Sequence, residues 1–546
     1  PESHEEIDKL ISYFETIKND YTVKEYDNII GFTLNPTKTD SFEFILIEDD
    51  IEIQSYVELR MNDSKIVIGK IDTIYSYNAG FFANPFTSSE STIFSSFDNF
   101  KKLFLNDYDK DWKRAAVIAY LNENKQDVKI ATAKIIGVID KGKSNRLEML
   151  RTPFEVGKAV YKADKDTISR LFEVNFSGKK IEKPIRVGYM KDTDIDVFID
   201  AEEVLSKHMM IVGTTGSGKS YFTTKLIYEF AKECEDLNII ILDPHGEYKS
   251  KLDKLSSYIK ELEFEDSIIH AFPEETVEFF KDVGLSSMLS SNSSTAKIIK
   301  DVINTYIKPY LTLTGLKNKS IKAIIEEIDK KINEDEKPKR SNKGDNNQDE
   351  NNNSKSIKSY FDAYGKELDN QPKIINDIIE SIENKEGKKI LILNFKNITY
   401  PETRANIAGL VMQHIFNKHK SEKFNRKLIV LEEAHSFAPE SKYGDTSSGK
   451  DNLALTMARK IASEGRKFGI GLIAVTQRPA QVSKYVLSQM NTQALFRTIN
   501  SNDLNALSIT IEHAGEDVIK LIPLLFTGSC VISGIAISFP VLIDVK

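Results

Sequence analysis

From about residue 196 to the end of the chain, apolar residues gather in short continuous runs that alternate with stretches of helical periodicity. Continuous apolar runs of this length are typical of strands that are buried on both faces of a parallel sheet. Such runs predict strands at residues 209–212, 238–242, 389–394, 428–431, 470–475 and 494–497. The helical segments between them indicate an α/β domain with a doubly wound parallel sheet.

The first part of the chain, to about residue 195, has a different pattern. Short strand-like runs follow one another there without a long helix between each pair, at residues 42–48, 57–61, 65–75, 115–121 and 129–139. Many short strands in succession favour a small antiparallel β-barrel, which we expect over residues 25–195. The amphipathic residues 3–17 predict an N-terminal helical segment over residues 1–24, either packed on a neighbour or frayed.

A long insertion, residues 250–386, separates the second and third strands predicted for the parallel sheet. Its apolar spacing at residues 295–311 and 357–382 is mostly helical, and we expect it to add no strand to the sheet. Residues 334–354 have almost no apolar side chains and cannot bury enough surface to order themselves, so they predict a flexible loop. The parallel-sheet domain then consists of residues 196–249 and 387–546.

The composition argues against a single core, a disulfide framework and a membrane span. A chain of 546 residues is too long for one core, and the 82 acidic residues outnumber the 74 basic ones, so no global positive field attracts nucleic acid. Cys234 and Cys530 lie far apart in apolar surroundings, which argues against a disulfide framework and fits a reducing cytosol. No signal peptide is visible, and the apolar residues 530–543 are too short to span a bilayer. We therefore expect sheet strands at 530–543 and a cytoplasmic protein without membrane contact.

A glycine-rich loop joins the first parallel strand to a helix. The sequence Gly-Thr-Thr-Gly-Ser-Gly-Lys-Ser, residues 213–220, follows the run 209–212 and leads into a helix-like segment at 221–234. Glycines let such a loop curl until its N–H groups face a phosphate, at a helix N-terminus whose dipole also favours negative charge. The alternative, a glycine-rich turn with an accidental Lys-Ser pair, leaves the flanking strand and helix unexplained. The motif therefore predicts a nucleotide hydrolase.

Each residue of the loop has an expected role. Lys219 would pair with the β- and γ-phosphates, and the Ser220 hydroxyl would ligate Mg²⁺, a hard cation that prefers oxygen ligands. The residues predicted to bind the nucleotide are Gly213, Thr214, Thr215, Gly216, Ser217, Gly218, Lys219, Ser220 and Tyr221.

Two adjacent carboxylates follow another apolar strand. Glu432 and Glu433 come directly after the run 428–431, as in a Walker B strand. Glu432 would contact the Mg²⁺ shell, and Glu433 would polarise the attacking water as a general base. Adjacent glutamates are usually a solvated pair, but the buried strand before them and the phosphate loop elsewhere in the chain favour the catalytic interpretation.

Several motifs in this order resemble the HerA family. They are Lys207-His208, the phosphate loop, Asp243-Pro-His-Gly-Glu-Tyr248, Glu432-Glu-Ala-His-Ser-Phe-Ala-Pro439 and Glu464-Gly-Arg-Lys-Phe-Gly-Ile-Gly-Leu-Ile-Ala-Val-Thr-Gln-Arg-Pro479. The match extends across most of residues 25–546. HerA-like proteins belong to the HerA and FtsK branch of P-loop ATPases. The resemblance therefore implies an N-terminal β-barrel, a RecA-like doubly wound core, and hexameric rings that translocate double-stranded DNA.

The resemblance also implies roles for single residues. Gln477, at the end of a predicted strand, resembles the sensor glutamine that contacts the γ-phosphate or its water; an ordinary strand-end turn is the alternative. Asp243 resembles the acidic residue that follows the second strand, close to the nucleotide. His245 and His435 have no second ligand at metal-binding spacing, so we favour structural or sensing roles for both.

A ring ATPase usually completes its site with a cation from the next subunit, because the developing negative charge on the γ-phosphate needs a further donor. Arg466 is the first candidate and Arg497 the second, with a surface ion pair as the alternative for each. HerA relatives commonly have arginine before the motif histidine. Here that residue is Lys207, which lacks the planar fork of arginine.

DNA-binding residues are harder to locate, because a translocating ring contacts phosphates from pore loops without reading bases. Candidates after the Walker B strand are Lys442, Lys450, Arg459 and Lys460, for each of which solvated surface charge is the alternative.

The sequence thus predicts a homohexameric ATPase that couples MgATP hydrolysis to movement on double-stranded DNA. The resemblance implies a separate effector, either a nuclease or a sirtuin-like NAD hydrolase, in antiphage defence or DNA end processing. Two alternatives stay open. One is an assembly scaffold whose nucleotide cycle activates a partner enzyme without translocation, and the other is a conjugation or secretion ATPase, which the expected barrel disfavours.

Overall fold

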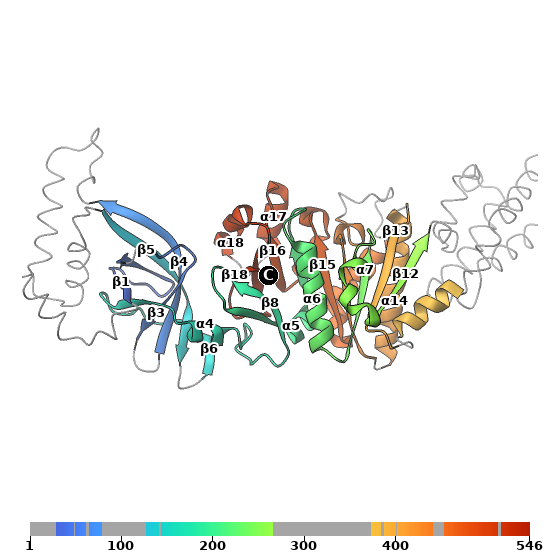
Figure 1. The fold of residues 1–546 in the computed structure, drawn as a ribbon, viewed down its shortest axis with the longest axis horizontal. Coiled ribbons are helices and arrows are strands. Elements are labelled where there is room, and N and C mark those ends of the chain that lie inside the picture. Colours follow the sequence, from blue (N-terminus) through green and yellow to red (C-terminus); the bar gives the residue numbers. More distant parts are fainter. Residues whose placement is uncertain are drawn as a thin grey trace, which may run out of the picture. The chain divides into compact units, whose positions relative to one another are not determined.

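The structure is a computed structural model, and its description covers residues 29–47, 50–61, 65–78, 127–140, 144–265, 373–383, 387–399, 401–422, 424–440, 452–510 and 515–545. The chain divides into two compact units, Pro1–Lys180 and Ile181–Lys546 (Figure 1). Several predicted features lie outside the described residues. They are the N-terminal segment 1–24, the strand at 115–121, the loop at 334–354, and the candidates Lys442 and Lys450.

The first unit contains a closed antiparallel barrel, as predicted. Its strands are β1 (Ile29–Thr33), β2 (Ser41–Leu46), β3 (Tyr56–Arg60), β4 (Lys65–Asn78), β5 (Asp127–Asp140), β6 (Ser144–Glu148) and β7 (Ala159–Lys162). They follow the order β2-β1-β7-β3-β4-β5-β6, and β2 also pairs with β5, so the first six strands of that order form a ring. Phe42, Phe44, Val57 and Val67 point into its core and are fully buried or nearly so. Such closure leaves no free edge among those six strands.

The second unit is built on an 11-stranded sheet, in the order β12-β13-β11-β14-β15-β10-β16-β17-β18-β8-β9. All six predicted strands are present and parallel: β10 (Met209–Val212), β11 (Leu237–Asp243), β13 (Ile390–Asn397), β14 (Arg426–Leu431), β15 (Ile470–Thr476) and β16 (Thr492–Phe496). Antiparallel strands continue the sheet beyond β16. Two of them, β17 (Ser529–Gly534) and β18 (Val541–Asp544), confirm the strands expected at 530–543.

The insertion adds a strand, so the expectation that it adds none was wrong. β12 (Ile259–Glu265) pairs in parallel with β13 at the edge of the sheet. Its sequence, IKELEFE, intersperses apolar residues with charged ones, and of its apolar side chains only Phe264 is buried. An edge strand with one polar face lacks the continuous apolar run that marks the central strands.

The boundary between the units also differs from the one predicted near residue 195. β8 (Pro184–Met190) and β9 (Asp196–Asp200) pair with each other, and β8 pairs with β18 of the 11-stranded sheet. These strands are short and antiparallel, so their sequence pattern is the same as that of barrel strands. The boundary of the compact units therefore falls between Lys180 and Ile181.

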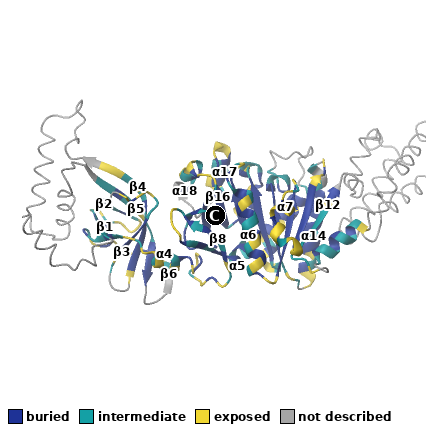
Figure 2. Cartoon of the chain, viewed as in Figure 1, coloured by how far each residue is buried: buried dark blue, intermediate teal, exposed yellow. Residues whose placement is uncertain are grey.

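Helices cover both faces of the parallel strands, which are the most deeply buried part of the unit (Figure 2). α14 (Pro401–Ser421) and α15 (Leu453–Glu464) share one apolar cluster with Met210, Val212 and Leu472. α6 (Lys219–Glu233) packs on β8, β10 and β11 without joining that cluster. The shorter helices are α5 (Ala201–Lys207), α7 (Tyr248–Lys251), α16 (Lys484–Ser488), α17 (Ser501–Thr510) and α18 (Gly515–Leu521). The carboxyl ends of the parallel strands form one edge of the sheet, where open α/β folds bind their ligands.

Candidate active site

The glycine-rich loop connects β10 to α6 at this carboxyl edge. Gly216 has φ +78° and Gly218 has φ +110°, conformations that favour glycine and let the loop turn its N–H groups toward a phosphate. Ser217 closes the turn, because its N–H and its hydroxyl both donate to the Thr214 carbonyl, at 3.2 and 2.7 Å. A Cβ at Gly213 would lie 2.4 Å from Cβ of Phe496, so no larger residue fits there.

Neighbouring strand ends hold this loop in place. Thr214 donates to the carbonyl of Arg497 twice, from its N–H at 2.8 Å and from its hydroxyl at 3.0 Å. The Gly528 N–H donates to the carbonyl of Ser217 at 2.9 Å, and the Gly213 N–H donates to that of Thr476 at 3.3 Å. The loop is therefore anchored before any ligand binds, which lowers the ordering cost of binding.

Lys219 and the two glutamates lie together beneath the loop. Lys219 is only 6% exposed; burial lowers its pKa, while the charges of Glu433 and Glu432 raise it. Glu432 follows the last residue of β14, and burial raises its pKa to about 7. The hydroxyl of Tyr248 donates a hydrogen bond of 2.6 Å to Oε2 of Glu432.

Glu433 combines a strained backbone with an unsatisfied carboxylate oxygen. Its φ of 47° lies in the left-handed region, which residues other than glycine rarely adopt. Oε2 of Glu433 is buried and accepts no hydrogen bond from the described residues. Nδ1 of His435 lies 3.3 Å from this oxygen and 3.4 Å from Oγ1 of Thr476. A buried oxygen in this state can accept a hydrogen bond from a bound water.

Gln477 lies against the phosphate loop, as a sensor residue requires. It follows the end of β15, and its Oε1 accepts a hydrogen bond of 2.6 Å from the hydroxyl of Thr215. Two motifs that are far apart in the sequence therefore meet at the same edge of the sheet.

The carboxylate of Asp243 accepts hydrogen bonds from N–H groups of the loop that follows it. Its Oδ1 accepts hydrogen bonds from the N–H groups of His245 at 3.1 Å and Gly246 at 2.9 Å, and its Oδ2 accepts one from Tyr248 at 2.9 Å. Contact of Asp243 with the nucleotide stays a prediction. The residue of this motif that sequence reasoning missed is Tyr248, and the only available signal was an aromatic residue five positions after the acidic one.

Comparison with known proteins places the chain in a family. A family model described as "Helicase HerA, central domain" matches residues 185–415. An uncharacterized protein of Aquifex aeolicus is 49% identical over 260 residues, which cover 47% of this chain and 94% of that protein. The probable helicase MJECL08 of Methanocaldococcus jannaschii is 25% identical over 95% of each chain. The DNA double-strand break repair helicase HerA of Pyrococcus furiosus is 24% identical over 95% of this chain and 92% of that protein. This chain belongs to the HerA family. It is a P-loop ATP hydrolase.

The two arginines proposed for this HerA-family site lie at opposite edges of the sheet. Arg497 is exposed, and its carbonyl contacts the phosphate loop of its own chain. Arg466 is also exposed but belongs to the 3₁₀ helix Gly465–Phe468, which precedes β15. The seven residues of β15 separate Arg466 from Gln477 by about 20 Å. Arg466 is therefore not brought to the phosphate loop of its own chain.

Lys207 lies at the same edge as Arg466, because it precedes β10. Its Nζ lies 2.9 Å from Oε2 of Glu203, one turn earlier on α5. His208, next along the chain, has φ 64° and ψ 163°, a conformation otherwise almost confined to glycine. Its Nδ1 accepts the Leu472 N–H at 3.0 Å, and its Nε2 donates to the Ala462 carbonyl at 3.1 Å. Burial lowers the pKa of His208 to about 4, so the ring is neutral and structural.

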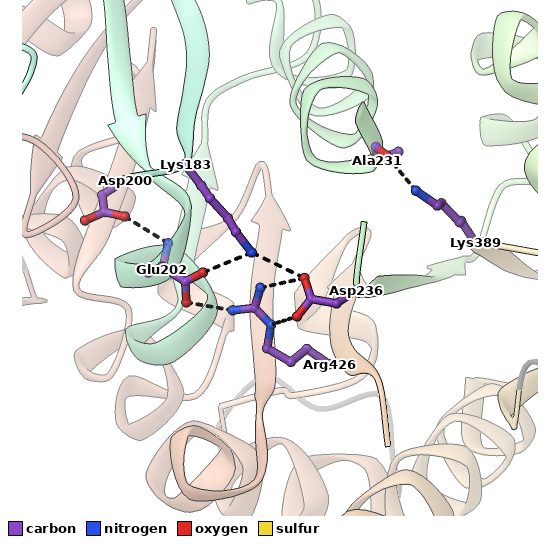
Figure 3. A network of polar contacts seen from close by, with 7 residues as sticks. All are labelled: Lys183, Asp200, Glu202, Ala231, Asp236, Lys389 and Arg426. Atoms are coloured by element: carbon purple, nitrogen blue, oxygen red, sulfur yellow. Dashed lines mark hydrogen bonds and ion pairs between the residues drawn. The ribbon is translucent and has the colours of Figure 1, made fainter. Parts of the chain in front are cut away.

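An ion-pair network fixes this second edge of the HerA-family core (Figure 3). The guanidinium of Arg426 contacts Asp236 through Nε at 2.8 Å and Nη2 at 2.9 Å, and contacts Glu202 through Nη1 at 2.6 Å. Nζ of Lys183 lies 3.3 Å from Asp236 and 3.6 Å from Glu202. The hydrogen bond from Arg426 lowers the pKa of Asp236 to about 2. The network joins β14 to α5, the helix that ends at Lys207.

The described candidates for DNA contact lie on α15. The Lys460 ammonium lies 4.6 Å from the ring centroid of Phe416, and Arg459 is partly buried. Neither geometry distinguishes a DNA contact from a surface cation, so both stay predictions. None of the helices in the described part of the chain combines the length and the hydrophobicity that a membrane span requires.

Proposed function

We propose that this HerA-family ATPase translocates double-stranded DNA as a homohexameric ring and hydrolyses MgATP between neighbouring subunits. The observation that supports it most is the division of the site between two edges. Lys219, Glu433 and Gln477 surround the phosphate loop, whereas Arg466 is exposed about 20 Å away at the other end of β15. In a head-to-tail ring, one edge of each subunit faces the opposite edge of the next. Arg466 would then reach the γ-phosphate of its neighbour.

The residues at the carboxyl edge fit Mg²⁺. Ser220 lies in the first turn of α6 and offers a hydroxyl oxygen, and Glu432 offers a buried carboxylate, both of the hard oxygen type that Mg²⁺ prefers. When bound, the ion would neutralise charge on the β- and γ-phosphates.

Glu433 is the group that would accept the proton from the attacking water. Its buried Oε2 accepts no hydrogen bond from the described residues, and Nδ1 of His435 lies 3.3 Å away, so a water held beside this oxygen could donate a hydrogen bond to the carboxylate. The water oxygen forms a bond to the γ-phosphorus, the bond from that phosphorus to the leaving ADP oxygen breaks, and the water proton passes to Glu433. Gln477 would report this step to the phosphate loop, because Thr215 already binds its amide oxygen.

DNA as the substrate is proposed from the relatives. The Pyrococcus furiosus protein that covers 95% of this chain is named a DNA double-strand break repair helicase. The separate effector, a nuclease or a sirtuin-like NAD hydrolase, and the place of the protein in antiphage defence or DNA end processing belong to the same proposal.

Displacement of the third strand from a DNA triplex tests translocation directly, because only a protein that moves along the duplex removes that strand. We expect displacement that requires ATP and is lost in Glu433→Gln. The matched control is Glu235→Gln, an exposed glutamate between α6 and β11 at the other edge of the sheet, which should displace the strand like the unmodified protein. ATP hydrolysis without displacement would instead favour a nucleotide-switched scaffold.

A further inference from the structure

The segment Asp243–Tyr248 is not used by the proposed reaction, although it lies beside the Walker B carboxylates. We propose that Tyr248 is a positioning residue that orients the Glu432 carboxylate toward Mg²⁺ and couples it to the phosphate-loop helix α6. The inference rests on the proposed metal role of Glu432.

The contact between the two side chains is short and shielded from water. The Tyr248 hydroxyl donates to Oε2 of Glu432 at 2.6 Å, and the two residues are 1% and 7% exposed. A hydrogen bond to an ionised carboxylate is about twice as strong as one between neutral groups. The phenol thereby fixes the orientation of the carboxylate, which would leave Oε1 to face the metal.

The backbone of Tyr248 is held as firmly as its ring. The Asp243 carboxylate binds the N–H groups of His245, Gly246 and Tyr248, which closes the turn between β11 and α7. Gly246 has φ +70°, and a Cβ at this position would lie 2.8 Å from Oδ1 of Asn394. The loop is therefore tightly packed, and in this conformation the hydroxyl of Tyr248 lies against the Glu432 carboxylate.

Tyr248 also lies close to α6. Its side chain is near that of Thr223, which donates through Oγ1 to the carbonyl of Lys219 at 2.9 Å. Glu432 is bound on its backbone side as well, since its N–H donates to the Leu242 carbonyl at 3.2 Å. Tyr248 thus lies where the Walker B strand, the second strand and the lysine-bearing helix meet. Partners of metal ligands placed in this way typically raise metal affinity by 10- to 100-fold.

The test is Tyr248→Phe, which removes one oxygen and keeps the ring. Binding of a fluorescent ATP analogue to the protein is measured without DNA, first in EDTA and then at increasing Mg²⁺ concentrations. We expect the half-saturating Mg²⁺ concentration to rise by about tenfold while affinity in EDTA changes by less than about twofold. Tyr258→Phe, on an exposed tyrosine of the neighbouring 3₁₀ helix, should match the unmodified protein.

A double-mutant cycle keeps the test independent of simple destabilisation. If Tyr248 acts through Glu432, adding Tyr248→Phe to Glu432→Gln should shift the Mg²⁺ dependence no further. An unchanged Mg²⁺ dependence in Tyr248→Phe, with only a lower melting temperature, would mean that the phenol has a packing role and would overturn the inference. An additive shift in the double variant would overturn it as well. Because no DNA is present, neither outcome bears on translocation.

Discussion

The hydroxyl of Thr215 donates a hydrogen bond of 2.6 Å to Oε1 of Gln477, although the two residues lie 262 positions apart in the sequence. The bond joins the phosphate loop to the end of β15, so movement of either is transmitted to the other. The bond to Thr215 fixes the amide oxygen of Gln477, and the amide NH₂, which carries both of its donors, is the group that can donate to a phosphate oxygen.

Gln477→Ala should therefore keep ATP binding and lose hydrolysis. We expect affinity for ATP to change by less than about threefold and the turnover rate to fall by about 10- to 100-fold, which is less than a lost oxyanion donor costs in some enzymes. Binding is measured with a fluorescent ATP analogue, and turnover by phosphate release. Gln489→Ala, at the end of α16, is the control. A large loss of affinity with normal turnover would show that Gln477 serves binding alone.

Glu433→Gln should bind ATP normally and hydrolyse it at least about 100-fold more slowly, because the amide cannot take a proton from water. Lys219→Ala should lose binding instead, since its ammonium is the cation buried beneath the phosphate loop. Lys225→Ala, on the same helix α6, is the control for the loss of a lysine. Normal turnover by Glu433→Gln would contradict the assignment of Glu433 as the general base.

Arg466→Ala should lose hydrolysis while ATP binding survives, because Arg466 cannot reach the phosphate loop of its own chain. Subunits with Arg466→Ala should regain activity when mixed with Glu433→Gln subunits, since some interfaces then combine an intact arginine with an intact base. Turnover of the mixture is measured against each variant alone. Arg497→Ala should fail to complement Glu433→Gln, because Arg497 lies beside the phosphate loop of its own chain. If mixing with Arg466→Ala restores nothing, the arginine does not act across the interface.

His208 should make the stability of the ATPase unit depend on pH. Its pKa is about 4 when folded, against about 6.5 when unfolded, so the unfolded chain binds the proton first as the pH falls. Stability is therefore complete above about pH 6.5 and decreases toward pH 4, by at most about 3 kcal/mol from this group. Urea unfolding of the protein and of His208→Asn should differ in their pH dependence by this amount. The exposed His245→Asn should keep the original dependence, and an identical dependence in His208→Asn would contradict the assignment.

The parts of this site that could be predicted from the sequence are those formed by residues adjacent in the chain. Strand, loop and helix are adjacent around Lys219, and Glu432 follows its strand directly, so both could be located before the structure was known. Tyr248 could not be assigned, because its partner Glu432 lies 184 positions away and their meeting depends on β11 and β14 being neighbours. β12 and β8 were missed for a different reason. An edge strand or a short antiparallel strand has no pattern that says which sheet it joins.

We propose that ATP hydrolysis by this HerA-family protein is coupled to double-stranded DNA. The most direct measurement is steady-state ATP hydrolysis with and without long linear duplex over a salt series, with Glu433→Gln as the blank. We expect DNA to stimulate hydrolysis and the stimulation to fade as salt increases, because phosphate contacts release counterions. A rate well above the blank that is the same with and without DNA at every salt concentration would contradict the claim.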